Sequence, residues 1–199
     1  MTKNKGFTII ELMLTIAVAG VLLVVGVPSF VTMTKNNCLT NKTNSLISAF
    51  QIARSTAITE RADIILAAKC MSDTEDNNGV ADGSCAAGDE YGSGVVVFRD
   101  IDGDNLADSE ANDVNGDGDV NEADFEIIRV IDFTCAATID ETANRLSFTY
   151  QADGTTTLAA GTTGFFNICD DRDSSEYTGR RITVNAIGRP HAESDFTCP

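Results

Sequence analysis

The chain has 199 residues, of which 14 are lysine or arginine and 30 are aspartate or glutamate, so the formal net charge is −16. Apolar residues make up 43% of the sequence, which is enough for a folded core and excludes wholesale disorder. The single histidine, His191, restricts any histidine-dependent catalytic site to that position, and the negative charge excludes nucleic-acid binding through the overall field.

The acidic residues are concentrated in one window of the sequence. Residues 73–126 contain 17 acidic side chains and one basic side chain, Arg99, whereas the rest of the chain contains 13 of each sign. The sequence therefore describes a neutral protein that carries one acidic insert.

The N-terminus combines a short basic leader, residues 1–6, with an apolar segment at residues 7–30. With its flanks, this segment is long enough to cross a hydrocarbon core of roughly 30 Å. A cleavable secretory signal has the same two regions, but no small-x-small cleavage site follows here. Such a signal also has no use for Glu11, because a charge within an apolar run costs at least about 2.5 kcal/mol. An intramembrane acid indicates a function by default, and it needs a positive partner.

These residues resemble the class III signal of type IV pilins and type II secretion pseudopilins. The matching positions are Gly6, Phe7, Glu11, Gly20 and Pro28. The resemblance implies that a prepilin peptidase cleaves between Gly6 and Phe7 and methylates the new amine. It also implies that Glu11 pairs with the N-terminal amine of a neighbouring subunit in the membrane, where each charge offsets the desolvation of the other.

The apolar segment is predicted to continue as one helix from about residue 7 to about residue 59, about 80 Å long. Its first part is apolar on all sides, as a membrane or filament-core helix would be. Its second part, residues 31–60, is amphipathic, because apolar residues recur there at helical spacing. These residues are Leu39, Leu46, Phe50, Ala53 and Ala57. We expect this stripe to pack on a globular head.

Residues 61–199 are predicted to form that head. Short β-rich segments separated by turn residues occur at 62–69, 94–100, 126–133, 145–150, 164–169 and 180–187. They predict an antiparallel sheet of about five to seven strands packed on the helix, and hence an α+β fold.

The second half of the sequence resembles the minor pilin and pseudopilin family of GspH, FimT and FimU. The matching segments are 53–66, 91–104, 126–130, 166–172 and 180–190. The sequence departs from the family at Tyr91, where the family often has Trp, and at residues 105–125, which have the character of an insertion.

Six cysteines follow the apolar segment, and an even number in an exported head predicts disulfides. Because there is no CxxC motif, neither a zinc ribbon nor a thioredoxin-like redox site is indicated. Six cysteines allow 15 connectivities, among which sequence does not choose. We expect Cys70–Cys85 to close a short acidic loop and Cys38–Cys198 to tie the C-terminus to the helix, which leaves Cys135–Cys169.

The acidic insert contains a calcium-loop pattern at residues 113–124. Acids or amides fall at loop positions 1, 3, 5, 7, 9 and 12, and Gly118 at position 6 allows the sharp turn around the ion. The expected calcium ligands are Asp113, Asn115, Asp117, Asp119, Asn121 and Asp124. Position 12 is Asp rather than Glu, and here the segment resembles dockerin-type loops. The alternative is a solvated acidic loop.

A second candidate calcium loop precedes the first. It would use Asp100, Asp102, Asp104 and Asp108. Asn105 replaces the usual glycine and Ala111 stands at position 12, so the alternative is an acidic turn that only shares counter-ions. We expect calcium to order the insert, at about residues 100–125, because its acids repel one another without cations.

The favoured function is that of a minor pilin that helps initiate or cap assembly of a type IV pilus. Its partners would be other pilins and the prepilin peptidase. Before assembly it would cross the inner membrane once, with its head in the periplasm, and after assembly it would lie in a pilus at the cell surface. A minor pseudopilin of a type II secretion system fits the same motifs, although external calcium favours the surface pilus.

Two binding functions and an enzymatic one remain as alternatives. A DNA-binding pilin for natural transformation would use a basic patch of Arg180, Arg181 and Arg189. The alternative is that these arginines are scattered around an ordinary turn at the end of a strand. A calcium-dependent adhesive tip is supported by the insert alone. An enzyme is least favoured, because His191 has no Ser or Cys partner motif and no phosphate-binding glycine loop is present.

Overall fold

The computed structural model describes residues 7–69, 91–100, 125–143, 145, 147–172 and 179–198. The chain divides into two compact units, Met1–Asn37 and Cys38–Pro199. One helix, α1 (Ile9–Glu60), contributes to both, and the strands all belong to the second unit.

The ends of α1 are set by local sequence. Thr8 and Glu11 form a capping box at its start, in which the Thr8 N–H donates to Glu11 Oε2 (2.9 Å) and the Glu11 N–H donates to Thr8 Oγ1 (3.3 Å). At the other end, Arg61 has a φ of 55°, the left-handed conformation that commonly follows the last helical turn. Pro28 lies inside the helix, as the sequence predicted.

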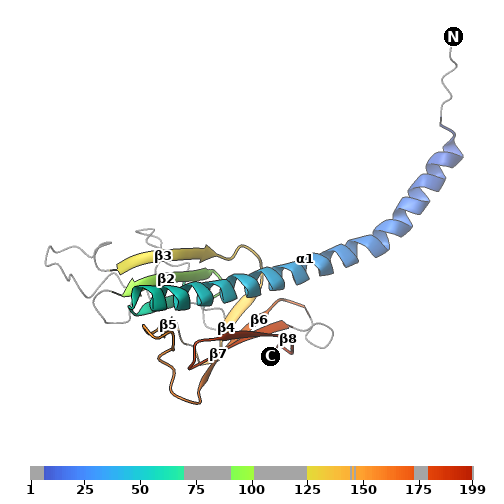
Figure 1. Ribbon diagram of the computed structural model, residues 1–199. Helices are drawn as coiled ribbons and strands as arrows, with labels where there is room; N and C mark the ends of the chain where they lie inside the picture. Colours follow the sequence, from blue (N-terminus) through green and yellow to red (C-terminus); the bar gives the residue numbers. More distant parts are fainter. Residues whose placement is uncertain are drawn as a thin grey trace, which may run out of the picture. The chain divides into compact units, whose positions relative to one another are not determined.

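The described part of the head contains eight strands in two antiparallel sheets (Figure 1). The first sheet has the order β3-β2-β1-β5, and the second has the order β4-β6-β7-β8. The strand bounds are β1 (Ile64–Ala68), β2 (Gly94–Asp100), β3 (Phe125–Asp132), β4 (Thr138–Glu141), β5 (Ser147–Tyr150), β6 (Thr163–Cys169), β7 (Gly179–Asn185) and β8 (Pro190–Phe196).

The predicted α+β class is confirmed, but the prediction of one sheet with five to seven strands is wrong. Each predicted strand segment overlaps an observed strand, whereas β4 and β8 were not predicted. Both have little local strand character, since β4 is only four residues long and β8 begins with Pro190. Their pairing with β6 and β7 respectively holds them in place, so tertiary context overrides local propensity.

One main core lies between the second part of α1 and the two sheets. The five residues of the predicted apolar stripe are all buried there, with Leu39 3% exposed and the other four 0% exposed, which confirms that prediction. Phe50 occupies the centre of this core. Its ring lies 6.0 Å from Phe148 in β5 and 5.1 Å from Phe166 in β6, so a single helical side chain contacts both sheets.

A buried lysine connects the same three elements. Lys42 is 3% exposed, and its Nζ donates to the carbonyl oxygens of Gly92 (3.0 Å) and Ala137. Gly92 precedes β2 in the first sheet, and Ala137 precedes β4 in the second. The Lys42 ammonium also lies 5.6 Å from the ring centre of Phe133, a distance that allows a cation–π contact.

The disulfides in the described residues are Cys38–Cys135 and Cys169–Cys198, so the predicted pairs Cys38–Cys198 and Cys135–Cys169 are wrong. The strand order explains the difference. Because β6, β7 and β8 are successive antiparallel neighbours, the chain after β8 returns beside the end of β6, where Cys198 meets Cys169. Cys38 on α1 is instead joined to the connection between β3 and β4. The predicted pair Cys70–Cys85 lies outside the described residues.

Candidate functional site

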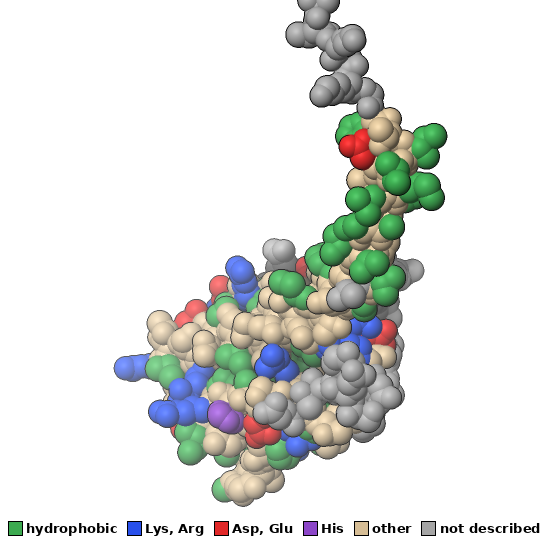
Figure 2. Space-filling model, turned by 90° about the vertical axis from the view of Figure 1, so that its right-hand side faces the viewer, with side chains coloured by type: hydrophobic (Ala, Val, Ile, Leu, Met, Phe, Trp, Pro, Cys, Tyr) green, Lys and Arg blue, Asp and Glu red, His purple; other side chains and the backbone are tan. Residues whose placement is uncertain are grey.

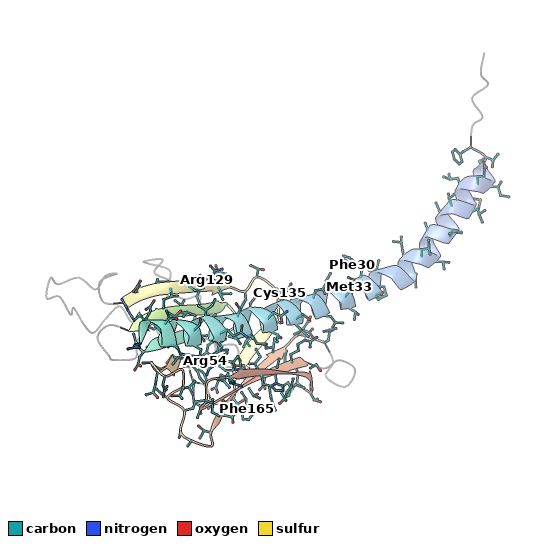
Figure 3. The ribbon with its side chains drawn as sticks, in the orientation of Figure 1. Phe30, Met33, Arg54, Arg129, Cys135 and Phe165 are labelled. Carbon is teal, nitrogen blue, oxygen red and sulfur yellow. A yellow bond between two sulfur atoms is a disulfide. The ribbon has the colours of Figure 1, made fainter. Side chains whose placement is uncertain are left out.

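The N-terminal part of α1 presents apolar side chains on every side. All its described large apolar side chains from Phe7 to Met33 are exposed, including Phe30 and Met33, which Figure 3 labels. An 18-residue window of the helix has a mean hydropathy of 2.6, and none of that window is buried. By length and composition, this helix is sufficient to cross a membrane. Exposed apolar surface on this scale requires either lipid or neighbouring protein.

Glu11 is the only acidic residue between positions 7 and 59. Its side chain forms part of the helix cap, because both the Thr8 N–H and the Thr8 hydroxyl donate to Glu11 Oε2 at 2.9 Å. Within the described part of the chain, the second carboxylate oxygen, Oε1, has no hydrogen-bond partner. Figure 2 shows one acidic side chain, in red, among the hydrophobic side chains of this segment. The capping box thus holds the carboxylate beside the start of the helix and leaves one oxygen available.

Residues 101–124, which contain the remaining expected calcium ligands, lie outside the described residues. Of the expected ligands only Asp100 is described, as the last residue of β2. Asp100 pairs with Phe125, the first residue of β3, so the two ends of this segment meet at one strand pair. Beside this pair, Arg99 Nη2 lies 2.6 Å from Glu126 Oε2, and Arg99 Nη1 lies 3.5 Å from Glu60 Oε2. Elsewhere in the described ranges, no group of three or more His, Cys, Asp or Glu side chains could hold a metal ion.

The three arginines of the predicted DNA-binding patch do not form one patch. Arg180 and Arg181 are successive residues of β7, so their side chains point to opposite faces of the sheet. Arg180 Nη2 lies 3.4 Å from Thr40 Oγ1 on α1, and Arg180 Nε is buried without a hydrogen-bond partner among the described residues. Arg189 is exposed in the turn between β7 and β8. The arginines therefore face different surroundings in the described part of the head.

Arg181 is held in an aromatic cluster on the outer face of the second sheet. Its guanidinium lies 3.9 Å from the ring centre of Phe196 and 5.3 Å from that of Phe165, and its Nε donates to Asn167 Oδ1 (2.9 Å). Figure 3 labels Phe165 on this sheet. The contacts fasten β8 to β6 and β7, so Arg181 has a structural role that the sequence did not reveal. The sequence shows Phe165 and Phe196 only as two phenylalanines far apart in the chain. The order of strands β6, β7 and β8 is what brings them together.

Comparisons with known proteins agree with these features. Residues 42–188 match the family "Type II transport protein GspH", and residues 1–27 match the "Prokaryotic N-terminal methylation motif". The crystal structure of the type IV minor pilin FimU of Pseudomonas aeruginosa (strain PAO1) in space group P21 is similar in fold, with a TM-score of 0.53 and 22% sequence identity over 81% of this chain and 92% of that chain. The P65 crystal form of the same FimU gives a TM-score of 0.49 and 19% identity over 77% of this chain and 91% of that one. No curated protein sequence matches the chain with significance.

A long N-terminal helix with a methylation motif, packed on antiparallel sheets, defines a pilin-type subunit. Because the family match extends over most of the sequence, the chain belongs to the GspH family of minor type IV pilins and pseudopilins. The resemblance found in the sequence is thereby confirmed. Members of this family are structural proteins that assemble with other pilins after processing by a prepilin peptidase.

Proposed function

We propose that this chain is a minor pilin that helps initiate or cap assembly of a type IV pilus. The observation that carries the proposal is the fully exposed apolar surface from Phe7 to Met33, with a single carboxylate at its start. Before assembly, lipid of the inner membrane covers this surface, with the head in the periplasm. After assembly, the corresponding helices of neighbouring subunits cover it, and the head lies in a pilus at the cell surface.

Glu11 is proposed to bind the N-terminal amine of a neighbouring subunit. The capping box supports this role, because it positions the carboxylate while leaving Oε1 without a partner in the described structure. The amine adds a charge-assisted hydrogen bond that Thr8 does not supply, and in a low-dielectric surrounding such a bond is worth more than in water. Replacing Glu11 by leucine should therefore prevent incorporation into filaments while leaving cleavage after Gly6 intact.

The first experiment is mass spectrometry of filaments sheared from the cell surface. A peptide that starts at methylated Phe7 in the sheared fraction is expected, and Glu11→Leu should remove it from that fraction while the processed chain stays in the membrane. Recovery of the processed chain from the envelope alone would favour a minor pseudopilin of a type II secretion system, the second candidate, to which the name of the matched family points. An intact Met1 terminus would overturn the pilin proposal.

The head is also proposed to bind one calcium ion through residues 113–124, and a second ion through the loop that begins at Asp100. The support is the spacing of the ligands, together with the Asp100–Phe125 pair that brings the two ends of the insert together. Ion binding would neutralise acids that otherwise repel one another and would order the insert from this strand pair outward.

Calorimetric titration of the full chain in detergent with CaCl2 gives the number of ions. Asp117→Ala should abolish the first, whereas Asp63→Ala, which removes an exposed acid outside the insert, should change nothing. Hydrogen exchange across residues 100–125 should slow in calcium; equal exchange with and without calcium would contradict the proposal.

A further inference from the structure

The two sheets have four edges, and three of them are covered or protected. The edge of β5 is covered by its own continuation, because the Thr157 N–H donates to the Thr149 carbonyl oxygen (3.1 Å). At the edge of β4, the Tyr91 N–H donates to the Ile139 carbonyl oxygen (3.2 Å). The edge strand β8 begins with Pro190 and exposes several polar side chains, two common protections against unwanted pairing.

Within the described residues no segment pairs with the outer edge of β3, although a β-bulge at Ile128 interrupts its register with β2 between Val97 and Phe98. At eight residues β3 is the longest strand described, it contains no proline, and its side chains Ile127 and Val130 are 40% and 36% exposed. Within the described residues, β2 is its only pairing partner. Long, exposed and apolar edge strands are the ones to which other chains add. In Figure 1, β3 is the outermost strand of its sheet.

The backbone groups on the free side of β3 can be assigned. The Phe133 N–H donates to the Ser93 carbonyl oxygen (3.0 Å), so Phe133 faces β2. Alternation in an antiparallel ladder then directs the backbone groups of Asp132 and Val130 away from β2. In agreement, Gly94, which is opposite Asp132, directs its carbonyl oxygen to the Lys69 N–H on the β1 side (2.9 Å). From Val130 to Asp132, on the C-terminal side of the bulge at Ile128, the edge thus offers alternating donors and acceptors.

The charges of β3 single out one side chain. Glu126 is paired with Arg99, and Asp132 is paired with Lys69 (2.6 Å in each case). Arg129 is exposed and has no ion pair or hydrogen bond within the ranges that the structure describes. Figure 3 labels it on the outer strand of the sheet. Because Glu126 and Asp132 are each paired with a basic side chain, Arg129 is the one unpaired charge among the described residues of β3.

We propose that β3 is an assembly edge to which an extended strand of a neighbouring pilin-type head adds, with a carboxylate opposite Arg129. This inference rests on the proposed assembly of the chain with other pilins. Strand addition supplies affinity through the main chain, and the side chain opposite Arg129 supplies selectivity.

The test is site-specific photo-cross-linking of the full-length chain in cells that make the filament. A photoreactive benzoylphenylalanine at Ile127 reports on the free edge, and the same residue at exposed Thr157 reports on a covered edge. The Ile127 probe should cross-link to another pilin-type subunit, and peptide mapping should place the cross-link in a strand that bears Asp or Glu. The Thr157 probe should give no such product.

Two variants separate backbone pairing from charge. Val130→Pro removes an N–H that points away from β2, so the fold should survive while strand addition is blocked. Arg129→Glu reverses the free charge, and Arg129→Lys keeps it. Val130→Pro should abolish the Ile127 cross-link, Arg129→Glu should reduce its yield at least about fivefold, and Arg129→Lys should keep most of it. If Val130→Pro does not fold, the Arg129 pair alone decides.

The outcomes distinguish this inference from the proposed function. A chain that is processed and incorporated into filaments, but whose Ile127 probe does not cross-link to another pilin-type head, overturns the assembly edge and leaves the function intact. A cross-link whose yield is the same in Arg129→Glu and Arg129→Lys also overturns it. A chain that is absent from filaments and from complexes with other pilins overturns both.

Discussion

Replacing Phe50 by alanine should strongly destabilise the head. The side chain is 0% exposed, and truncation of a buried phenylalanine costs about 3–5 kcal/mol. The upper part of that range is expected here, because the rings of Phe148, Tyr150 and Phe166 lie 5.1–6.4 Å from the Phe50 ring and belong to two different sheets. These neighbours cannot all move into the cavity without disturbing a strand ladder, and edge-to-face contacts are lost as well. We therefore expect a loss of about 4–5 kcal/mol.

The assay is urea unfolding of the full chain in detergent, followed by near-ultraviolet circular dichroism, because the chain contains no tryptophan. Ile58→Ala on the same helix is the matched control, since Ile58 is 46% exposed and should lose less than about 1 kcal/mol. Because Phe50 contacts both sheets, they should also unfold in one transition. A loss below about 2 kcal/mol for Phe50→Ala, or a second sheet that unfolds separately, would refute the reasoning.

Three further predictions concern single features of the head. Arg61→Gly should raise the free energy of unfolding by about 0.5–1 kcal/mol, because glycine adopts the left-handed φ of 55° without strain; Arg61→Ala should give no such gain in the same urea assay. Burial raises the pKa of Tyr150 well above its ordinary value of about 10, so the unfolded chain loses this proton at a lower pH than the folded chain does. The free energy of unfolding should therefore fall as the pH rises above about 10, and the accompanying fall in the urea midpoint should be smaller in Tyr150→Phe. Replacing both Cys38 and Cys135 by serine should cost about 4–5 kcal/mol of unfolding free energy, since their disulfide spans 97 residues, and the reasoning fails if removing the C-terminal disulfide, which spans 29, costs more.

The features that sequence predicted correctly depend on local patterns. The buried stripe of α1 follows from helical spacing alone, as Leu46 and Phe50 illustrate. The strands β2 and β6 are runs of β-branched and aromatic residues bounded by turns, so they too were visible without tertiary information. The N-terminal methylation motif is a local pattern of the same kind.

The features that sequence missed depend on strand order. The division into two sheets requires β5 to pair with β1, and β4 to pair with β6, across long stretches of chain. The disulfide partners of Cys38 and Cys169 follow from that order, so the predicted tie of the C-terminus to the helix and the pair left over from it were both wrong. The arginine patch failed for a related reason, since β7 places Arg180 and Arg181 on opposite faces.

The covalent link between α1 and the connection before β4 determines how the head carries mechanical load. A pull applied between the helix and the second sheet passes through the Cys38–Cys135 bond and then directly into β4 and the strands that follow. Three strands of the first sheet, β1, β2 and β3, and the acidic insert lie between these two cysteines in the sequence, inside the closed loop, and so are bypassed. In a filament under tension, force can therefore reach the rest of the head without stretching the segment in which the calcium-loop sequence occurs.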